Sequence, residues 1–129
     1  MLGAHFAGAA VERSMLGATH ACANPLTARY GTIHGVAIGL LLPHVVRWNG
    51  SVVNGRYAAL AAAAGVDDLG DLLTRLSRVA AFPAGLAAAG ASREDLGRLA
   101  ADAAAQWTGT FNPRPFDAAG AREIYEAAW

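Results

Sequence analysis

The chain is poor in the residues that form disulfides and strongly charged surfaces. It has a single cysteine, Cys22, and all ten of its basic residues are arginines. One cysteine excludes an internal disulfide and fits a reducing compartment, so we expect a cytoplasmic protein in which Cys22 is a small buried hydrophobe. The formal net charge is zero and the arginines are scattered, which argues against nucleic acid or an acidic membrane as a partner.

Secretory and membrane-spanning patterns are also missing. The N-terminal residues do not combine a basic stretch with an apolar run and a small-residue cleavage site, so we expect no secretory signal. The longest apolar run, residues 36–46, contains Pro43 and His44. It is about half of the ~20 residues that span a bilayer, and we predict that it is a buried core helix.

Several widespread catalytic motifs are absent. There is no P-loop, no H-E-x-x-H, no G-x-S-x-G elbow and no G-x-G-x-x-G following a strand. We therefore expect that the chain by itself does not bind a dinucleotide.

What is present favours an all-α fold. Just over half of the 129 residues are apolar, alanine and leucine dominate, and no useful strand-like alternation occurs. The length fits one domain, residues 1–129. Apolar periodicity predicts a bundle of about seven helices, over residues 2–16, 17–26, 33–48, 57–64, 68–79, 93–107 and 117–129.

Local signals predict where these helices begin and end. Asn49-Gly50 is a stop signal, Gly65 is placed to close the fourth helix, and residues 108–115 read as an extended loop. Three sites are predicted to cap helices, namely Asp67 or Asp68, Ser92 with Asp95 in capping-box spacing, and Asp117.

Two histidines, His20 and His34, are the first candidates for chemistry. On one unbroken helix they would lie roughly 21 Å apart, too far for imidazole nitrogens that must approach a shared metal to about 2 Å. Pro25 and Gly31 lie between them, and a break there would let a helix–turn–helix bring both rings together. The spacing permits a shared metal site without requiring one.

The alternative is that these histidines cap helices or fill the core. A catalytic metal usually has at least three protein ligands, so two histidines are an incomplete set, and spacing alone favours this alternative. His5 and His44 fit it better still, because each lies in an apolar helical stretch without a neighbouring turn.

Two further features have a functional and a structural interpretation. Asn24 follows His20 by one turn, where it could bind a ligand, orient a ligating histidine, or cap the break before Pro25. The stiff segment Asn112-Pro-Arg-Pro115 could frame a pocket mouth or act as a rigid connector. Both interpretations stay open.

Residues 17–49, with the pattern G-x-x-H-A…N-P-L-T…H-G-x-A-x-G-x-x-L-P-H-V-x-x-x-N, resemble the C-terminal helical domain of the iron-containing alcohol dehydrogenases. Later landmarks follow in family order up to the closing I-Y-E-A-A-W, so the resemblance covers nearly the whole chain. It implies a domain that normally follows a nucleotide-binding α/β domain, here expected to be absent, with iron or zinc between the two. A small alcohol or aldehyde would be the substrate and NAD(P) the cofactor of the whole enzyme.

The resemblance also implies roles for individual residues. His20 and His34 match the two ligating histidines of the family's H-A…H-G motif, while an aspartate and a histidine from an upstream helix complete the metal site. Asn24 takes a position where many members have another histidine near the nicotinamide, which puts a proton-relay role there in doubt. Thr108 falls beside the substrate-pocket loop.

Two other interpretations follow from the expected lack of a nucleotide domain. The chain could be a non-enzymatic helical module that associates with itself through the apolar surface left exposed. It could also be a small stand-alone metal protein, which would need at least one further ligand, with His5 as the only spare histidine near the first helix.

Overall fold

The computed structural model describes residues 1–129 and consists of helices without any strand. The α-helices are α1 (Leu2–Ser14), α2 (Ala18–Tyr30), α3 (His34–Ala63), α4 (Leu69–Val79), α5 (Leu96–Ala104) and α6 (Ala118–Ala127), joined by the 3₁₀ helices η1 (Arg93–Asp95) and η2 (Trp107–Phe111). The predicted all-α class is confirmed, with six α-helices in place of about seven.

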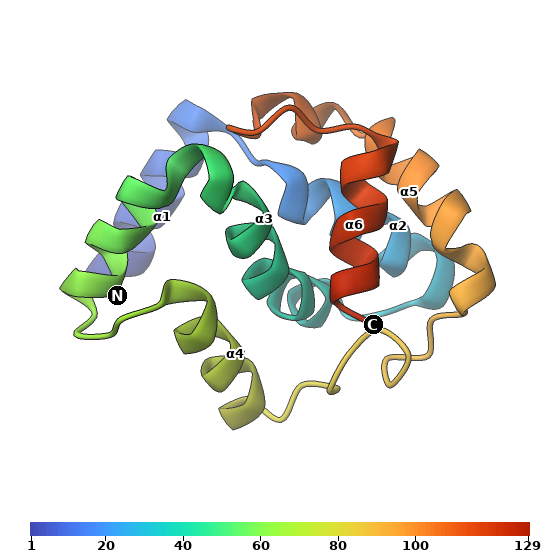
Figure 1. Ribbon diagram of the computed structural model, residues 1–129, viewed down its shortest axis with the longest axis horizontal. Helices are drawn as coiled ribbons and strands as arrows, with labels where there is room; N and C mark the ends of the chain where they lie inside the picture. Colours follow the sequence, from blue (N-terminus) through green and yellow to red (C-terminus); the bar gives the residue numbers. More distant parts are fainter.

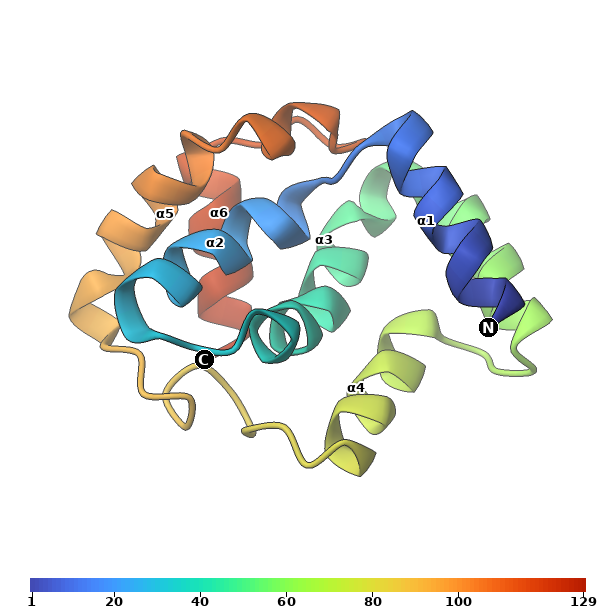
Figure 2. The same cartoon turned by 180° about the vertical axis from the view of Figure 1, so that it is seen from behind.

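The core lies where α2, the first half of α3, α5 and α6 meet (Figures 1 and 2). Helix α4 packs against α3 on one side of this group. The largest fully buried side chains are Tyr125, Leu26, Leu41, Leu86 and Leu99. Cys22 is buried in the same cluster and burial raises the pKa of its thiol to about 12, so it is the inert hydrophobe that we expected.

Helix α1 takes no part in this core. It lies away from the α2–α5–α6 group in both views, and none of its residues is buried (Figures 1 and 2). Its apolar Leu2, Phe6 and Val11 are all exposed. The predicted helix is therefore present, but its apolar residues cover nothing within this chain.

Helix α3 is much longer than predicted. It continues through Pro43 and Asn49-Gly50 and merges with the predicted fourth helix, with a kink at Val53, where φ is −125° and ψ is 21°. The stop predicted at Asn49 is wrong because that side chain is buried and hydrogen-bonded to Asn112 instead of forming a turn. By length and hydropathy α3 could cross a membrane, but several of its apolar residues are part of the core.

The break predicted at Pro25 is also wrong, because α2 runs through it to Tyr30. A proline inside a helix removes one backbone donor and disturbs the preceding turn. Here the Tyr125 hydroxyl donates a 2.6 Å hydrogen bond to the Cys22 carbonyl in that turn. The helix ends at Gly31, whose φ of +65° is a left-handed conformation that glycine adopts without strain.

Two of the three predicted helix caps are confirmed. Asp68 accepts a hydrogen bond from the Asp71 N–H at 2.7 Å, and Asp117 accepts one from the Gly120 N–H at 2.8 Å. Gly65 follows α3 with a positive φ, as predicted. The segment predicted as an extended loop instead begins within η2.

The capping box at Ser92 and Asp95 does not form. Ser92 makes no side-chain cap, and Asp95 binds Arg29 at 2.7 and 2.9 Å and the Tyr30 hydroxyl at 2.5 Å. These partners come from the end of α2 and out-compete the local cap, since a bidentate arginine is the stronger donor. Helix α5 consequently starts at Leu96.

Replacing Asp95 by asparagine is expected to lower stability at neutral pH by a small, pH-dependent amount. Hydrogen bonds from Arg29 and then Tyr30 hold the pKa of Asp95 below its ordinary value of 3.8. A lowered folded-state pKa stabilises the protein above the unfolded pKa, and this is lost as pH falls through the folded one. Urea unfolding at pH 7, 4 and below should show the two proteins converging at low pH, and a difference independent of pH would contradict this account.

Candidate metal centre

The turn between α2 and α3 brings the two candidate ligands together. His20 lies in the first turn of α2 and His34 is the first residue of α3. Their ring centroids are 5.5 Å apart and the ring planes are tilted by 48°. The helix–turn–helix that the spacing permitted is therefore present, with its break at Gly31 and not at Pro25.

This arrangement fits a shared metal ion. Two imidazoles that each place a nitrogen about 2 Å from one tetrahedral ion have ring centres roughly 5 Å apart. The 5.5 Å between the rings of His20 and His34 is close to that value.

Protonation also favours metal binding at this point. Burial, and then the neighbouring His34, lower the pKa of His20 below its ordinary value of 6.5. A neutral imidazole has the free electron pair that a metal ligand needs, and two imidazolium ions at this distance would repel each other. His34 is the more exposed of the two side chains.

Within the chain, the pair has no third ligand. No three histidine, cysteine, aspartate or glutamate side chains lie close enough together to hold a metal ion. His5 is on exposed α1 against Phe6, so its interpretation as a core histidine is wrong. His44 is half-buried on α3, and burial lowers its pKa.

Asn24 lies beside a groove between α2 and α5. Its side-chain N–H donates to Gln106 Oε1 at 2.9 Å, which was not foreseen because Gln106 is 82 positions away in the chain. The groove has a volume of about 460 Å³, and Arg29 and Asp102 also line it. Because α2 does not break at Pro25, Asn24 does not cap a break there.

Thr108 is buried in η2, and its hydroxyl has no hydrogen-bond partner. It does not line the groove beside Asn24, and neither does either histidine. The structure thus brings His20 and His34 together but does not join Asn24 and Thr108 in one pocket. Their assignment to a substrate or cofactor pocket stays a prediction.

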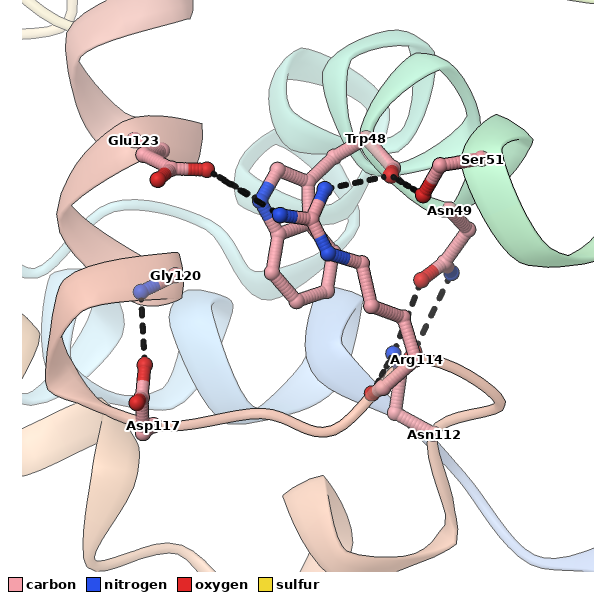
Figure 3. Close-up of polar contacts among 8 residues, drawn as sticks. All are labelled: Trp48, Asn49, Ser51, Asn112, Arg114, Asp117, Gly120 and Glu123. Atoms are coloured by element: carbon pink, nitrogen blue, oxygen red, sulfur yellow. Dashed lines mark hydrogen bonds and ion pairs between the residues drawn. The ribbon is translucent and has the colours of Figure 1, made fainter.

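The segment from Asn112 to Pro115 is a tightly held connector (Figure 3). Arg114 lies over the Trp48 ring, 3.9 Å from its centroid, and donates to the Trp48 carbonyl at 2.8 Å. The Trp48 indole N–H in turn donates to Glu123 on α6 at 2.7 Å. These contacts favour the connector interpretation over that of a pocket mouth.

Comparisons with known proteins agree on one family. The family model for "Fe-containing alcohol dehydrogenase family, C-terminal" matches residues 1–129. Lactaldehyde reductase of Escherichia coli is 33% identical over an alignment of 139 positions, which covers 99% of this chain and 36% of that protein. An aldehyde-alcohol dehydrogenase of Streptococcus pneumoniae is 42% identical over 45 residues, 35% of this chain and 5% of that protein.

A solved structure supports the same relationship. The crystal structure of a 1,3-propanediol oxidoreductase superposes with a TM-score of 0.81 at 29% identity, over 89% of this chain and 33% of that one. The chain thus spans about a third of the length of the relatives that it matches over nearly its whole length. By sequence over its full length and by fold, this chain belongs to the iron-containing alcohol dehydrogenase family and corresponds to its C-terminal helical domain.

Proposed function

We propose that this chain is the metal-binding C-terminal part of an NAD(P)-linked alcohol oxidoreductase, in which His20 and His34 are two ligands of one divalent ion, iron or zinc. The observation that carries the proposal is the 5.5 Å between their rings, created by a helix–turn–helix. Because the chain belongs to the iron-containing family over its whole length, we interpret this pair as metal ligands.

When bound, the metal supplies a Lewis acid that polarises the oxygen of the alcohol or aldehyde. The contribution of this chain is to hold two imidazoles close together at the start of α2 and α3. The substrate is a small alcohol or aldehyde, in keeping with the lactaldehyde and 1,3-propanediol in the names of the relatives. The other ligands and the nucleotide site have to come from residues outside this chain.

Asn24 and Gln106 are hydrogen-bonded side chains in the groove between α2 and α5, which we propose as part of the substrate or cofactor pocket. Their hydrogen bond fixes the Asn24 amide one turn after His20. Unlike a histidine, an amide does not exchange protons near neutral pH, so Asn24 offers hydrogen bonds and not a proton relay. The buried Thr108 hydroxyl, which lacks a partner, is a separate candidate for the substrate pocket, because it does not line the groove beside Asn24.

The test is a titration of the 129-residue chain with Zn²⁺, followed through the NMR signals of its four histidine rings. Only the signals of His20 and His34 should shift, because His5 and His44 lie outside the pair. His20→Ala is expected to weaken Zn²⁺ binding at least about tenfold, since a single imidazole is left.

His5→Ala is the matched control, because it removes an exposed histidine from α1. It should leave the affinity for Zn²⁺ unchanged. Equal affinity of the wild-type chain and His20→Ala would overturn the assignment of the metal pair.

A non-enzymatic module is not favoured, because the match extends over the entire chain and includes the histidine pair. Self-association is a separate question. The exposed Leu2, Phe6 and Val11 of α1 are consistent with the homo-oligomer that we expected, and that expectation stays a prediction.

A further inference from the structure

Two asparagines that are 63 positions apart form a reciprocal amide pair (Figure 3). The Asn49 side chain donates to Asn112 Oδ1 at 3.1 Å, and the Asn112 side chain donates to Asn49 Oδ1 at 2.8 Å. Asn49 is only 3% exposed and lies on α3, the helix that begins with His34. The pair therefore attaches the connector that contains Asn112 to one of the two ligand-bearing helices.

The same Asn112 oxygen also binds the other ligand-bearing helix. It accepts a hydrogen bond from the Ala18 N–H at 3.2 Å, at the first residue of α2. Gly17 occupies the N-cap position and has no side chain with which to cap the helix. A Cβ on Gly17 would lie 3.1 Å from Asn112 Oδ1, so the missing side chain makes room for this contact.

The peptide unit held in this way is the one on which the first turn of α2 is built. Its carbonyl, that of Gly17, accepts hydrogen bonds from the N–H groups of His20 and Ala21, both at 3.1 Å. Its N–H, that of Ala18, is bound by Asn112. The position of the His20 backbone therefore depends directly on this one peptide, and through Asn112 on α3.

We propose that Asn112, held by Asn49, is a positioning residue that fixes the first turn of α2 and thereby sets the His20 imidazole against that of His34. Asn112 acts as an N-cap supplied from 94 positions away. Its connector is itself immobilised, since Arg114 lies against Trp48. The inference rests on the proposed function, because the purpose of this placement is the shared metal.

The test compares Asn112→Ala with Asp117→Ala in the 129-residue chain. Both variants remove one side-chain cap from a helix N-terminus, but Asp117 caps α6 and makes no hydrogen bond to α2. We expect Asn112→Ala to weaken Zn²⁺ binding about tenfold, the lower end of the loss seen when groups that orient metal ligands are removed. Asp117→Ala should bind Zn²⁺ as the wild-type chain does.

Two measurements without metal examine the placement itself. A nuclear Overhauser effect between the imidazoles of His20 and His34 is expected in the wild-type chain, given the 5.5 Å between the rings, and should weaken or vanish in Asn112→Ala. Hydrogen exchange of the Ala18 amide should become faster in the same variant. Asn112→Asp keeps an acceptor for this amide but loses the donor to Asn49 Oδ1, so its affinity for Zn²⁺ should lie between those of Asn112→Ala and the wild-type chain.

A second route reaches the same contact without changing Asn112. Gly17→Ala places a methyl group against Asn112 Oδ1 and should shift the affinity in the same direction, which keeps the test decisive if Asn112→Ala does not fold. Equal effects of Asn112→Ala and Asp117→Ala would overturn the positioning role in favour of a general loss of stability. Unchanged affinity and an unchanged imidazole contact in Asn112→Ala would overturn it as well.

The two proposals fail in different ways. If Zn²⁺ does not shift the signals of His20 and His34 in the wild-type chain, the proposed metal function is wrong. The imidazole contact and the Ala18 exchange rate then still decide whether Asn112 positions α2. If Zn²⁺ binding needs His20 but does not depend on Asn112, only the positioning role is wrong.

Discussion

Replacing Tyr125 by alanine is expected to lower the free energy of unfolding by about 3–5 kcal/mol, the range for removing a large buried aromatic side chain. Tyr125 is fully buried and is among the largest side chains of the core. It packs at the centre of the cluster in which α6 meets α2 and α5. Truncation would leave a cavity directly behind the helix that holds His20.

The hydroxyl of Tyr125 contributes separately from its ring. It donates to the Cys22 carbonyl at 2.6 Å, and burial raises the pKa of the phenol, so it stays a protonated donor. Tyr125→Phe leaves that carbonyl without this partner, for which the expected cost is about 1–3 kcal/mol. Tyr30→Phe is a control at a half-buried site and should cost less, because water can replace the lost hydrogen bonds to Asp95 and from Ser92.

Urea unfolding followed by far-UV circular dichroism measures all three variants. The expected order of destabilisation is Tyr125→Ala, then Tyr125→Phe, then Tyr30→Phe. If Tyr125→Phe were as stable as the wild-type chain, the hydrogen bond to Cys22 would not help to stabilise α2 around Pro25.

Gly120→Ala is the second change with a large expected effect, about 2–3 kcal/mol of destabilisation through overpacking. A Cβ at this position on α6 would lie 2.5 Å from Cζ2 of Trp48, closer than atoms can approach without movement. The Trp48 indole cannot swing aside easily, because it is hydrogen-bonded to Glu123 and covered by Arg114 (Figure 3). The methyl group would therefore force α6 away from α3.

Gly97→Ala is the matched control and should change stability in the opposite direction. Gly97 lies exposed in α5, and a Cβ there meets nothing within 4 Å. An alanine in an unobstructed helical position reduces the entropy of the unfolded chain and stabilises by about 0.4–1 kcal/mol. Thermal or urea unfolding of both variants gives the two signs, and stabilisation by Gly120→Ala would contradict the packing described for Trp48.

Much of the fold could be predicted because many of its signals are local. The caps at Asp68 and Asp117 and the glycines that follow α2 and α3 act on neighbouring backbone groups, so a short stretch of sequence suffices to find them. The helix breaks that we predicted at Asn49-Gly50 and at Pro25 are wrong because those predictions considered local signals alone. At Asn49 the local preference for a break is overridden by a tertiary partner, Asn112. At Pro25 the helix continues in a buried stretch of the core, beside the Cys22 carbonyl that Tyr125 binds.

In the candidate site, too, some residues could be predicted from the surrounding sequence and others could not. The pattern around His20 and His34 identified the pair, and the turn at Gly31 explains why residues fourteen positions apart can meet. The partner of Asn24 could not be foreseen, since Gln106 has no motif that links it to α2. Thr108 was predicted for the pocket, and the structure leaves that prediction untested while burying its hydroxyl without a partner.

The sequence by itself determined that the chain is helical, where several of its helices begin and end, and which two histidines are candidate ligands. The helices and their ends depend on composition, on periodicity and on residues a few positions apart, whereas the two histidines are singled out by the family pattern that the surrounding sequence resembles. Only the tertiary structure decided that α2 and α3 continue through Pro25 and Asn49, and that Asn112 caps α2 from 94 positions away. The physical reason is that a buried polar group takes the best partner that the folded chain offers, and that partner need not be near in sequence.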